Sequence, residues 1–447
     1  MRDWLDTDLK YNWHPYTQMS TLRDDPPLLI ERAKGLKLYD DHGEWYYDAI
    51  SSWWCNVHGH GHPRLREAVH RQMAKLDHVL FGAVAHHPAI ELAERLILLA
   101  PEGLTRVFYS DNGSTSVEVA LKMSVQYWRN VGRPEKHAFV HLDHGYHGDT
   151  VGCMSVSGVD LFRDAFSPLL FPAYQVPTPY CYRCPEGCEP SRCGTACLGK
   201  LEALLREKAD EIAGLILEPL LLGAGGMIVY PPSYLAGAAR LATQYGVHLI
   251  LDEVATGFGR TGTMFACEQA KVCPDFLCLS KGLTGGTLPL AATLTTEEVY
   301  DAFLGMPGSG KTFYHGHTYT GNPIGCALAL ASLDLFQDDR LLERMADTAP
   351  LLQAGMQRFT NLLYVGEARG IGMVAALELV RDTTTKEPLP TGDPLPARIC
   401  REALRHHLFL RPIGNVIYLF LPQCATAEEV TDILHRLQAT LETALTL

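Results

Sequence analysis

VHLILDEVATGFGRTG, residues 247–262, joins an apolar run to a glycine-rich turn. The run at 247–251 ends on Asp252, and Gly257, Gly259 and Gly262 follow it. A short segment that is apolar throughout is typical of a strand whose sheet is covered by helices on both faces. Ligands of such sheets bind beyond the carboxyl ends of the strands. Asp252 is therefore a candidate binding residue, although an acid at this place can also be a helix cap or part of an ion pair.

Similar apolar runs lie on both sides of this segment. Strands are predicted at 106–109, 138–142, 214–218, 247–252 and 276–279. Helices are predicted from His62 and from His87, where apolar residues recur at helical spacing. Strands that alternate with helices indicate an α/β fold with a mostly parallel sheet.

The pattern divides the chain into three parts. Residues 1–60 contain short strand-like runs at 36–39 and 45–48, residues 61–330 form the large α/β domain, and residues 331–447 form a smaller α+β domain. In the last part, GIGMVAALELV (370–380) and NVIYLFLP (415–422) are each predicted as a strand, 383–396 as a loop and 427–445 as a closing helix. We expect the N-terminal segment to join the smaller domain in space.

Composition excludes several classes of partner. Acids outnumber bases 51 to 38, giving a net charge of -13, which disfavours binding to nucleic acid or to an anionic membrane. No run approaches the ~18 apolar residues of a membrane helix, and MRDWLDTDLK at the start lacks the features of a secretory signal. Thirteen cysteines, many of them single within apolar runs, favour reduced thiols in the cytoplasm.

Lys281 directly follows the apolar run DFLCL (275–279) in the motif LSKG. A lysine held near dry surroundings has a lowered pKa and can form an imine. Asp252, at the end of another strand, could pair with a pyridinium nitrogen and keep the ring an electron sink. A solvated loop lysine is the alternative interpretation of Lys281.

Two further strand ends suit the same chemistry. In YSDNGSTSVEVALKM (109–123), Gly113 and Ser114 at a helix start offer N–H groups and a hydroxyl to a phosphate, or simply cap the helix. In HLDHGYHGDT (141–150), Tyr146 could stack on a flat cofactor, or be a buried structural tyrosine. An imine lysine, a pyridinium acid, a phosphate turn and a stacking aromatic on one sheet together predict a pyridoxal phosphate site.

GMPGSGKT (305–312) matches the P-loop pattern of nucleotide triphosphatases. That pattern requires a strand before it and a helix after it. Here the preceding EEVYDAFLG is helical in pattern, and the following FYHGHTYTGN is polar and aromatic. We interpret the segment as a mobile glycine-rich loop near an active site.

A cluster of cysteines lies in YCYRCPEGCEPSRCGTACLG. Its C-x2-C opening could bind zinc or an iron–sulfur cluster, and a thiol-rich surface insertion is the alternative. Nothing else in the chain requires a metal, so we predict none. The cysteines are Cys181, Cys184, Cys188, Cys193 and Cys197.

Almost end to end, these motifs resemble those of the class III aminotransferases, which have pyridoxal phosphate fold type I. The matching segments include SSWWCNVHGHGHP (51–63), GYHGDT (145–150), EPLLLGAGGM (218–227), DEVATGFGRTG (252–262), LSKGLTGGTLPLAATLTT (279–296) and HGHTYTGNP (315–323). WHPYTQM (13–19), SSWW and LRPIGNVIYL (410–419) resemble the biotin-pathway branch of the family. This implies ping-pong transamination of 8-amino-7-oxononanoate to 7,8-diaminononanoate, with S-adenosylmethionine as donor, or lysine as in some relatives.

The resemblance also implies the residues that hold the cofactor. Lys281 would carry it as an imine and move the proton, and Asp252 would bind the pyridine nitrogen. Gly113 and Ser114 would hold the phosphate. In a homodimer with shared active sites, His317 and Thr318 of the partner subunit would complete the phosphate site, although many members of the branch have proline at the position of His317.

The substrate residues implied by the resemblance form a second set. Arg411 would clamp the carboxylate of the keto acid, because its guanidinium matches a carboxylate with two hydrogen bonds. Tyr16 is counted with Lys281 and Asp252 as catalytic, and Arg260 and Asp149 would lie close by. The remaining pocket residues would be Trp53, Tyr146 and Gly316.

Three other functions remain open at this stage. Another class III ω-aminotransferase would act on a different amine, such as ornithine, 4-aminobutyrate or a diamine. A binding protein that retains the cofactor would show no turnover. A metalloprotein would be built around the cysteine cluster.

Overall fold

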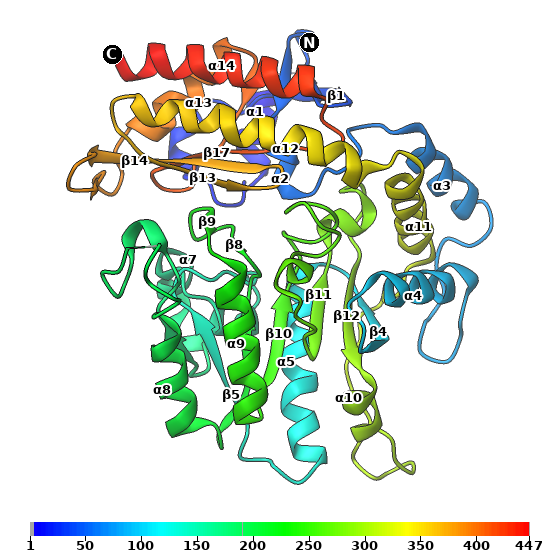
Figure 1. The fold of residues 1–447 in the computed structure, drawn as a ribbon. Helices are drawn as coiled ribbons and strands as arrows, with labels where there is room; N and C mark the ends of the chain where they lie inside the picture. The colour runs from blue at the N-terminus through cyan, green and yellow to red at the C-terminus, as the bar shows by residue number, and fades with distance from the viewer. Residues whose placement is uncertain (1–3, 190, 447) are drawn as a thin grey trace.

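In the computed structural model, residues 4–189 and 191–446 are described. The large central sheet has seven strands in the order β4–β12–β11–β10–β7–β5–β6 (Figure 1). Neighbouring strands run parallel except at β12, which is antiparallel to both of its neighbours. The prediction of a mostly parallel sheet is therefore confirmed. The strands are β4 (Leu104–Ser110), β5 (Ala138–Leu142), β6 (Tyr174–Val176), β7 (Ile212–Leu217), β10 (His248–Asp252), β11 (Phe276–Leu279) and β12 (Ala291–Thr296).

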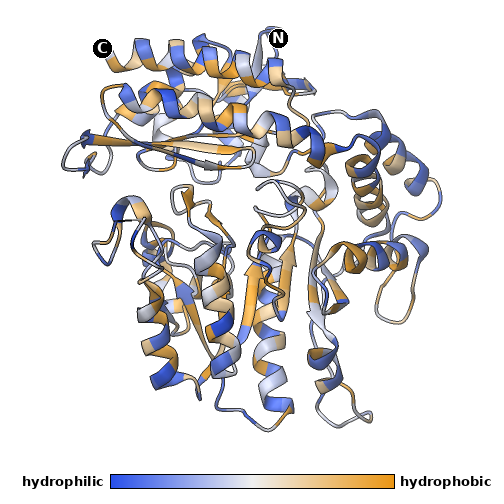
Figure 2. Cartoon of the chain, in the orientation of Figure 1, coloured by the Kyte–Doolittle hydropathy of each residue, from blue (hydrophilic) through white to orange (hydrophobic). Residues whose placement is uncertain are grey.

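Helices on both faces explain why the central strands are apolar throughout (Figure 2). Successive side chains of a strand point to opposite faces. In β10, Ile250 belongs to the same core cluster as side chains of α5, whereas Leu249 and Leu251 share a core cluster with side chains of α8 and α9. The helices that flank the sheet or continue its strands are α5 (Gly113–Asn130), α6 (Val151–Ser155), α7 (Asp160–Arg163), α8 (Leu198–Lys208), α9 (Pro232–Tyr245) and α10 (Glu297–Ala302). Three more pack together beside β4: α3 (Pro63–Met73), α4 (His87–Leu99) and α11 (Pro323–Asp338).

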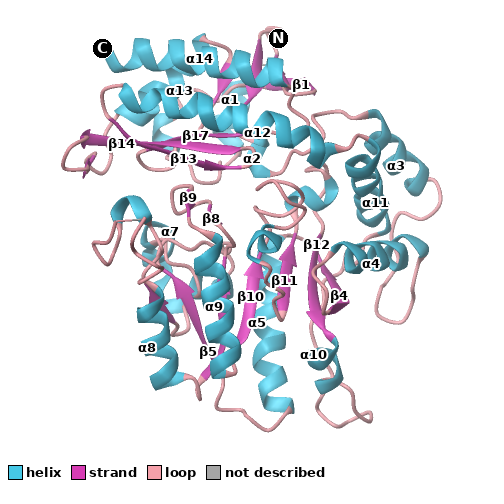
Figure 3. Ribbon diagram, in the orientation of Figure 1, coloured by secondary structure: helices cyan, strands magenta, loops and turns pink. Residues whose placement is uncertain are grey.

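The two ends of the chain build the smaller part of the fold (Figure 3). One sheet combines β1 (Ile30–Lys34), β2 (Lys37–Asp40) and β3 (Trp45–Asp48) with β16 (Leu408–Phe409), which pairs in parallel with β3. A second sheet contains β13 (Val365–Ile371), β14 (Val374–Asp382), β15 (Glu387–Pro388) and β17 (Val416–Phe420). The helices of this part are α1 (Trp4–Tyr11), α2 (Ser51–Trp54), α12 (Leu341–Gln357), α13 (Leu395–Arg405) and α14 (Ala427–Thr446). The domain limits at residues 60 and 330 stay our prediction.

The prediction of one strand over residues 370–380 is wrong. The chain turns back at Gly372 and Met373, so that β13 and β14 form an antiparallel hairpin. Gly372 has φ +55°, and a Cβ atom there would overlap the carbonyl oxygen of Arg260. Because glycine has no Cβ, it adopts this left-handed conformation without steric cost.

The segment 305–312 does not have the geometry of a P-loop, which requires a strand before it and a helix after it. It follows helix α10, and the chain after it has no regular structure until α11 begins at Pro323. Among residues 4–189 and 191–446, no helix combines the length and the apolar character that crossing a membrane requires.

Candidate active site

A cavity of about 650 Å³ lies at the carboxyl ends of β4, β5, β7, β10 and β11. It contains five of the residues predicted to form the site, which reach it from four separate strand ends. These are Gly113, Ser114, Tyr146, Asp252 and Lys281. The structure therefore brings the predicted cofactor residues together, and their individual roles stay predictions.

Lys281 begins the short 3-10 helix Lys281–Thr284, directly after β11. Its φ of 46° lies in the left-handed region that a non-glycine residue rarely adopts. Burial lowers the pKa of Lys281, and the nearby Asp252 carboxylate opposes this effect. Its Nζ lies 4.9 Å from the centroid of the Trp54 ring. An amine that loses its proton more readily is the nucleophile that imine formation requires.

Asp252 is fixed from two directions. Its Oδ2 lies 2.8 Å from Nδ1 of His147, and its Oδ1 accepts a hydrogen bond from the Val254 N–H at 3.1 Å. Both side chains of the Asp252–His147 pair are buried. Sequence reasoning missed His147, although it stands next to Tyr146 in a segment that had been singled out.

The start of α5 fits a phosphate group. Asn112 caps the helix, because its side chain accepts the Thr115 N–H while the Thr115 hydroxyl accepts the Asn112 N–H. The N–H groups of Gly113 and Ser114 and the Ser114 hydroxyl take no part in this capping. The backbone at Gly113 packs closely against Val254, since a Cβ atom at Gly113 would lie 2.6 Å from Cγ1 of Val254. Free N–H groups at a helix start suit an anion.

Glu218 is a second cavity residue that sequence reasoning gave no role. It follows β7 and accepts hydrogen bonds from the N–H groups of Tyr146 at 2.9 Å and of Gly223 at 3.0 Å. Burial raises the pKa of Glu218 to about 7. The available signal was an acid at the end of a wholly apolar strand, the same signal that identified Asp252.

Tyr16, Trp53 and Arg411 form a cluster beside the cavity rather than in its wall. The Tyr16 hydroxyl donates to Oδ1 of Asp149 at 2.5 Å and lies 3.2 Å from the Tyr146 hydroxyl. The Tyr16 and Trp53 rings meet edge to face at 5.7 Å. Arg411 lies over the Trp53 ring and donates to the Tyr16 carbonyl at 2.9 Å. Because Tyr146 and Asp149 line the cavity, the cluster reaches it through them.

Gly316, His317 and Thr318 do not line this cavity. Nδ1 of His317 lies 3.8 Å from Oδ2 of Asp111, and its N–H donates to the Thr320 hydroxyl at 2.9 Å. A role in the site of a partner subunit stays a prediction.

Arg260 also lies outside the cavity. Its guanidinium donates to the carbonyl oxygens of Leu421 and, at 3.0 Å, Asn56. Burial lowers its pKa to about 9. Arg260 thus ties the N-terminal segment to the C-terminal part of the chain.

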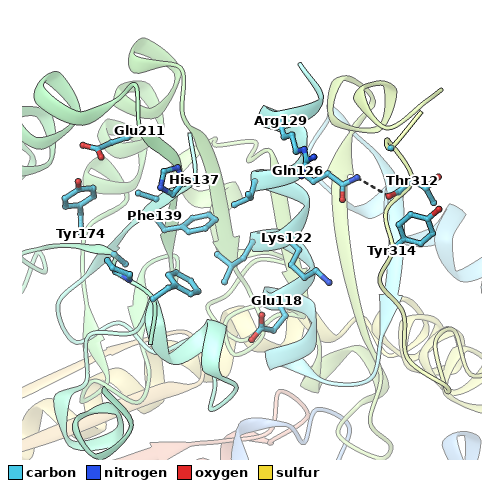
Figure 4. A pocket seen from close by; sticks show the side chains of 17 residues that line it. Glu118, Lys122, Gln126, Arg129, His137, Phe139, Tyr174, Glu211, Thr312 and Tyr314 are labelled. Atoms are coloured by element: carbon cyan, nitrogen blue, oxygen red, sulfur yellow. Dashed lines mark hydrogen bonds between the residues drawn. The ribbon is translucent and has the colours of Figure 1, made fainter. Parts of the chain in front are cut away.

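A larger cavity, of about 770 Å³, contains none of the predicted site residues. Side chains of α5 such as Lys122 and Gln126 face Thr312 and Tyr314 across it, with His137 and Tyr174 on the other side of the helix (Figure 4). We assign the chemistry to the smaller cavity, because only that one holds the lysine, the acid and the helix start.

The cysteine cluster consists of free thiols. In the described part of the chain, which omits residue 190 inside this segment, no three metal-binding side chains are arranged to hold an ion. The segment packs on the C-terminal hairpin, where Arg183 forms a 2.7 Å ion pair with Glu378.

The fold and this cavity define a pyridoxal-phosphate-dependent transferase. A family model described as aminotransferase class-III matches residues 19–441. The chain belongs to the class III aminotransferase family, and pyridoxal phosphate is its cofactor.

Named relatives support this assignment over nearly the whole length. The adenosylmethionine-8-amino-7-oxononanoate aminotransferase of Geobacter sulfurreducens is 49% identical and covers 99% of this chain and 97% of its own. The crystal structure of the enzyme of that name from Methanocaldococcus jannaschii has a TM-score of 0.93 and 42% identity, covering 98% of both chains. An amine transaminase from an uncultivated Pseudomonas species, in its PLP-bound form, has a TM-score of 0.93 and 36% identity, covering 97% of this chain and 99% of its own.

Proposed function

We propose that this aminotransferase converts 8-amino-7-oxononanoate to 7,8-diaminononanoate in biotin biosynthesis, with S-adenosylmethionine as amino donor. The observation that carries the proposal is the cavity that joins Lys281, Asp252 and the start of α5, in a chain up to 49% identical to relatives named for this reaction. Lysine as donor, or another ω-amine, is the competing function.

The residues in and beside the cavity have separate roles in this reaction. Bound pyridoxal phosphate supplies the electron sink, and Asp252 holds its ring nitrogen while Gly113 and Ser114 hold its phosphate. Lys281 acts as the general base that moves the proton between cofactor and substrate carbons. Tyr16, Trp53 and Tyr146 shape the entrance, and Arg411 binds the substrate carboxylate.

One experiment tests the reaction directly. Purified protein is incubated with the keto acid and with S-adenosylmethionine, lysine or ornithine in turn, and products are identified by mass. We expect 7,8-diaminononanoate with S-adenosylmethionine. If 7,8-diaminononanoate forms only with lysine, the donor is lysine. If it forms with none of the three donors, the proposal is overturned.

A second measurement concerns the attachment residue. Borohydride reduction of the protein loaded with pyridoxal phosphate should add the cofactor mass to the peptide that contains Lys281, because reduction makes an imine permanent. The Lys281→Ala variant should remain unlabelled and lose at least a hundredfold in activity, the low end of what a general base contributes. Labelling of another peptide in the unaltered protein would contradict the role of Lys281.

The homodimer and the cytoplasmic location belong to the same proposal. The exposed aromatic and apolar side chains of Met306, Tyr314 and Tyr319 support a second copy at the 305–323 segment, beside the larger cavity. That copy would bring His317 and Thr318 of the partner subunit to the phosphate. Light scattering should give twice the mass of one chain. The thirteen cysteines, many of them single within apolar runs, support a cytoplasmic location.

A further inference from the structure

Three acids line the cavity in the described part of the chain, and two of them are already engaged by other side chains. Asp252 is bound by the His147 imidazole, and Asp149 accepts the Tyr16 hydroxyl. Glu218 accepts only backbone N–H groups, those of Tyr146 and Gly223. It is therefore the carboxyl group of this wall that remains available to a ligand.

The surroundings of Glu218 suit a cation. Glu218 is 5% exposed, and no basic side chain of residues 4–189 or 191–446 forms an ion pair with it within 4.0 Å. A buried carboxylate without a counter-ion is unfavourable, and a cationic ligand relieves that cost.

An aromatic surface lies next to this carboxyl group. Trp54 lines the cavity, and a Cβ atom at Gly223, whose N–H binds Glu218, would lie 3.1 Å from Cζ3 of its ring. The indole N–H is already used, since it donates to the Tyr418 hydroxyl at 3.1 Å. Its ring face also carries the Lys281 amine at 4.9 Å. A carboxylate together with an indole face is the chemistry that recognises an ammonium group.

We propose that Glu218 binds the ammonium group that neighbours the reacting ketone of the acceptor, and so selects α-amino ketones over simple ketones. This inference rests on the proposed function. In 8-amino-7-oxononanoate the amine carbon is bonded to the ketone carbon, which places the nitrogen about 2.5 Å from the reacting carbon by ordinary bond lengths. The group that binds this nitrogen must therefore lie beside Lys281. Glu218 meets this requirement, because it lines the same cavity as Lys281 and the Trp54 ring lies close both to the Lys281 amine and to Gly223, whose N–H binds Glu218.

The test compares two acceptors that differ only in the ammonium group, 8-amino-7-oxononanoate and 7-oxononanoate. The Glu218→Gln variant keeps the shape of the side chain and removes its charge. We expect its KM for the amino ketone to rise about tenfold or more, as the loss of a charge-assisted hydrogen bond predicts, and its KM for 7-oxononanoate to change less than about twofold. Glu253→Gln, which alters a buried carboxyl group outside the cavity, should leave the ratio of the two KM values unchanged.

A binding measurement separates recognition from turnover. The protein loaded with pyridoxamine phosphate is titrated calorimetrically with 8-amino-7-hydroxynonanoate and with 7-hydroxynonanoate, which lack the reacting ketone. The unaltered protein should bind the amino alcohol more tightly, and Glu218→Gln should lose that preference. If Glu218→Gln does not fold, Glu218→Asp, which draws the charge back by one methylene, gives the same comparison.

The outcomes distinguish this inference from the proposed function. If the unaltered protein does not aminate 8-amino-7-oxononanoate, the proposed function fails. If it does, and the Glu218 variants weaken both acceptors equally or neither, the proposed function stands and the role of Glu218 is overturned.

Discussion

Burial sets the charge of the key side chains in the cavity more than ion pairing does. It lowers the pKa of the Lys281 amine and raises that of the Glu218 carboxyl group to about 7. Both effects favour the neutral form, because a low-dielectric environment disfavours charge. Lys281 can therefore offer a neutral amine in the same cavity as Glu218, which has no basic partner among the described residues. The Asp252 carboxyl group, in contrast to that of Glu218, has a side-chain partner, since its Oδ2 lies 2.8 Å from Nδ1 of His147.

We predict that His147 acts through Asp252 as a positioning residue. His147→Leu removes the hydrogen bond to Asp252 and should lower activity by about tenfold to a hundredfold, the range seen when the partner of a ligating side chain is lost. His147→Asn places an N–H donor close to the position of Nδ1 and should recover most of that loss. The pH dependence of the absorbance spectrum of the protein loaded with pyridoxal phosphate should differ from that of the unaltered protein in His147→Leu and not in His147→Asn. Equal spectral shifts in both variants would refute the role.

A second prediction concerns pH and the buried Glu253. Its carboxyl group accepts hydrogen bonds from two backbone N–H groups and from the Thr256 hydroxyl, yet burial raises its pKa from 4.5 to about 7. The folded chain then binds this proton more tightly than the unfolded chain does. Its contribution to the free energy of unfolding is fully present below pH 4.5 and is lost as the pH rises toward 7, by at most about 1.4 kcal/mol per pH unit.

Urea unfolding at pH 5, 6 and 7 measures this slope. Glu253→Gln should make the fall with pH shallower. Glu102→Gln, at an exposed acid, should leave the slope as it is. An unchanged slope in Glu253→Gln would show that Glu253 is ionised throughout this pH range.

Among the elements, the central strands were the most predictable and the turns the least. A short run that is apolar throughout, such as 247–251, is expected for a strand whose two faces are both covered by helices. The sequence alone was therefore sufficient to predict this strand. The reversal at Gly372 was hidden, because Met373 is apolar like its neighbours and the left-handed φ of Gly372 cannot be recognised from the sequence. Likewise His147, which binds Asp252, and Tyr146, whose N–H binds Glu218, stand 105 and 72 residues away from these acids, and pairing over such distances depends on how the elements pack.

The turn between β13 and β14 gives a prediction with a matched control. Gly372 and Gly414 have nearly the same φ, +55° and +54°, but only a Cβ at Gly372 would meet other atoms. Gly414→Ala should cost about 1 kcal/mol from backbone conformation alone. Gly372→Ala should cost more, about 1–3 kcal/mol beyond that, because the Arg260 carbonyl must move. Thermal unfolding of the two variants checks this, and equal Tm values would contradict it.

For the molecule as a whole, Arg260 is the tie between segments that are far apart in sequence. Its guanidinium has no carboxylate partner among residues 4–189 and 191–446, and it is held by the carbonyl groups of Asn56 and Leu421, over the ring of Phe420. Arg260→Met should lower the free energy of unfolding by about 3 kcal/mol, since it removes two hydrogen bonds from a charged donor.

Denaturant unfolding tests this tie against a surface pair. Arg381, which pairs with Glu387 on the surface, is the control, and Arg381→Met should change the free energy of unfolding by less than about 1 kcal/mol. Arg260→Lys should fall between the two, because one ammonium group can reach a single carbonyl. A loss in Arg260→Met no larger than in Arg381→Met would show that the tie is unimportant.

The parallel pairing of β3 with β16 also constrains the order in which the molecule can mature. Tyr47 and Asp48 leave the ribosome early, but their partners Leu408 and Phe409 are made about 360 residues later. Until then one edge of β3 is open, and an open strand edge invites pairing with another chain. A translation product that stops before Leu408 would therefore lack Arg411 and expose an adhesive edge, so premature termination should yield aggregates rather than a slower enzyme.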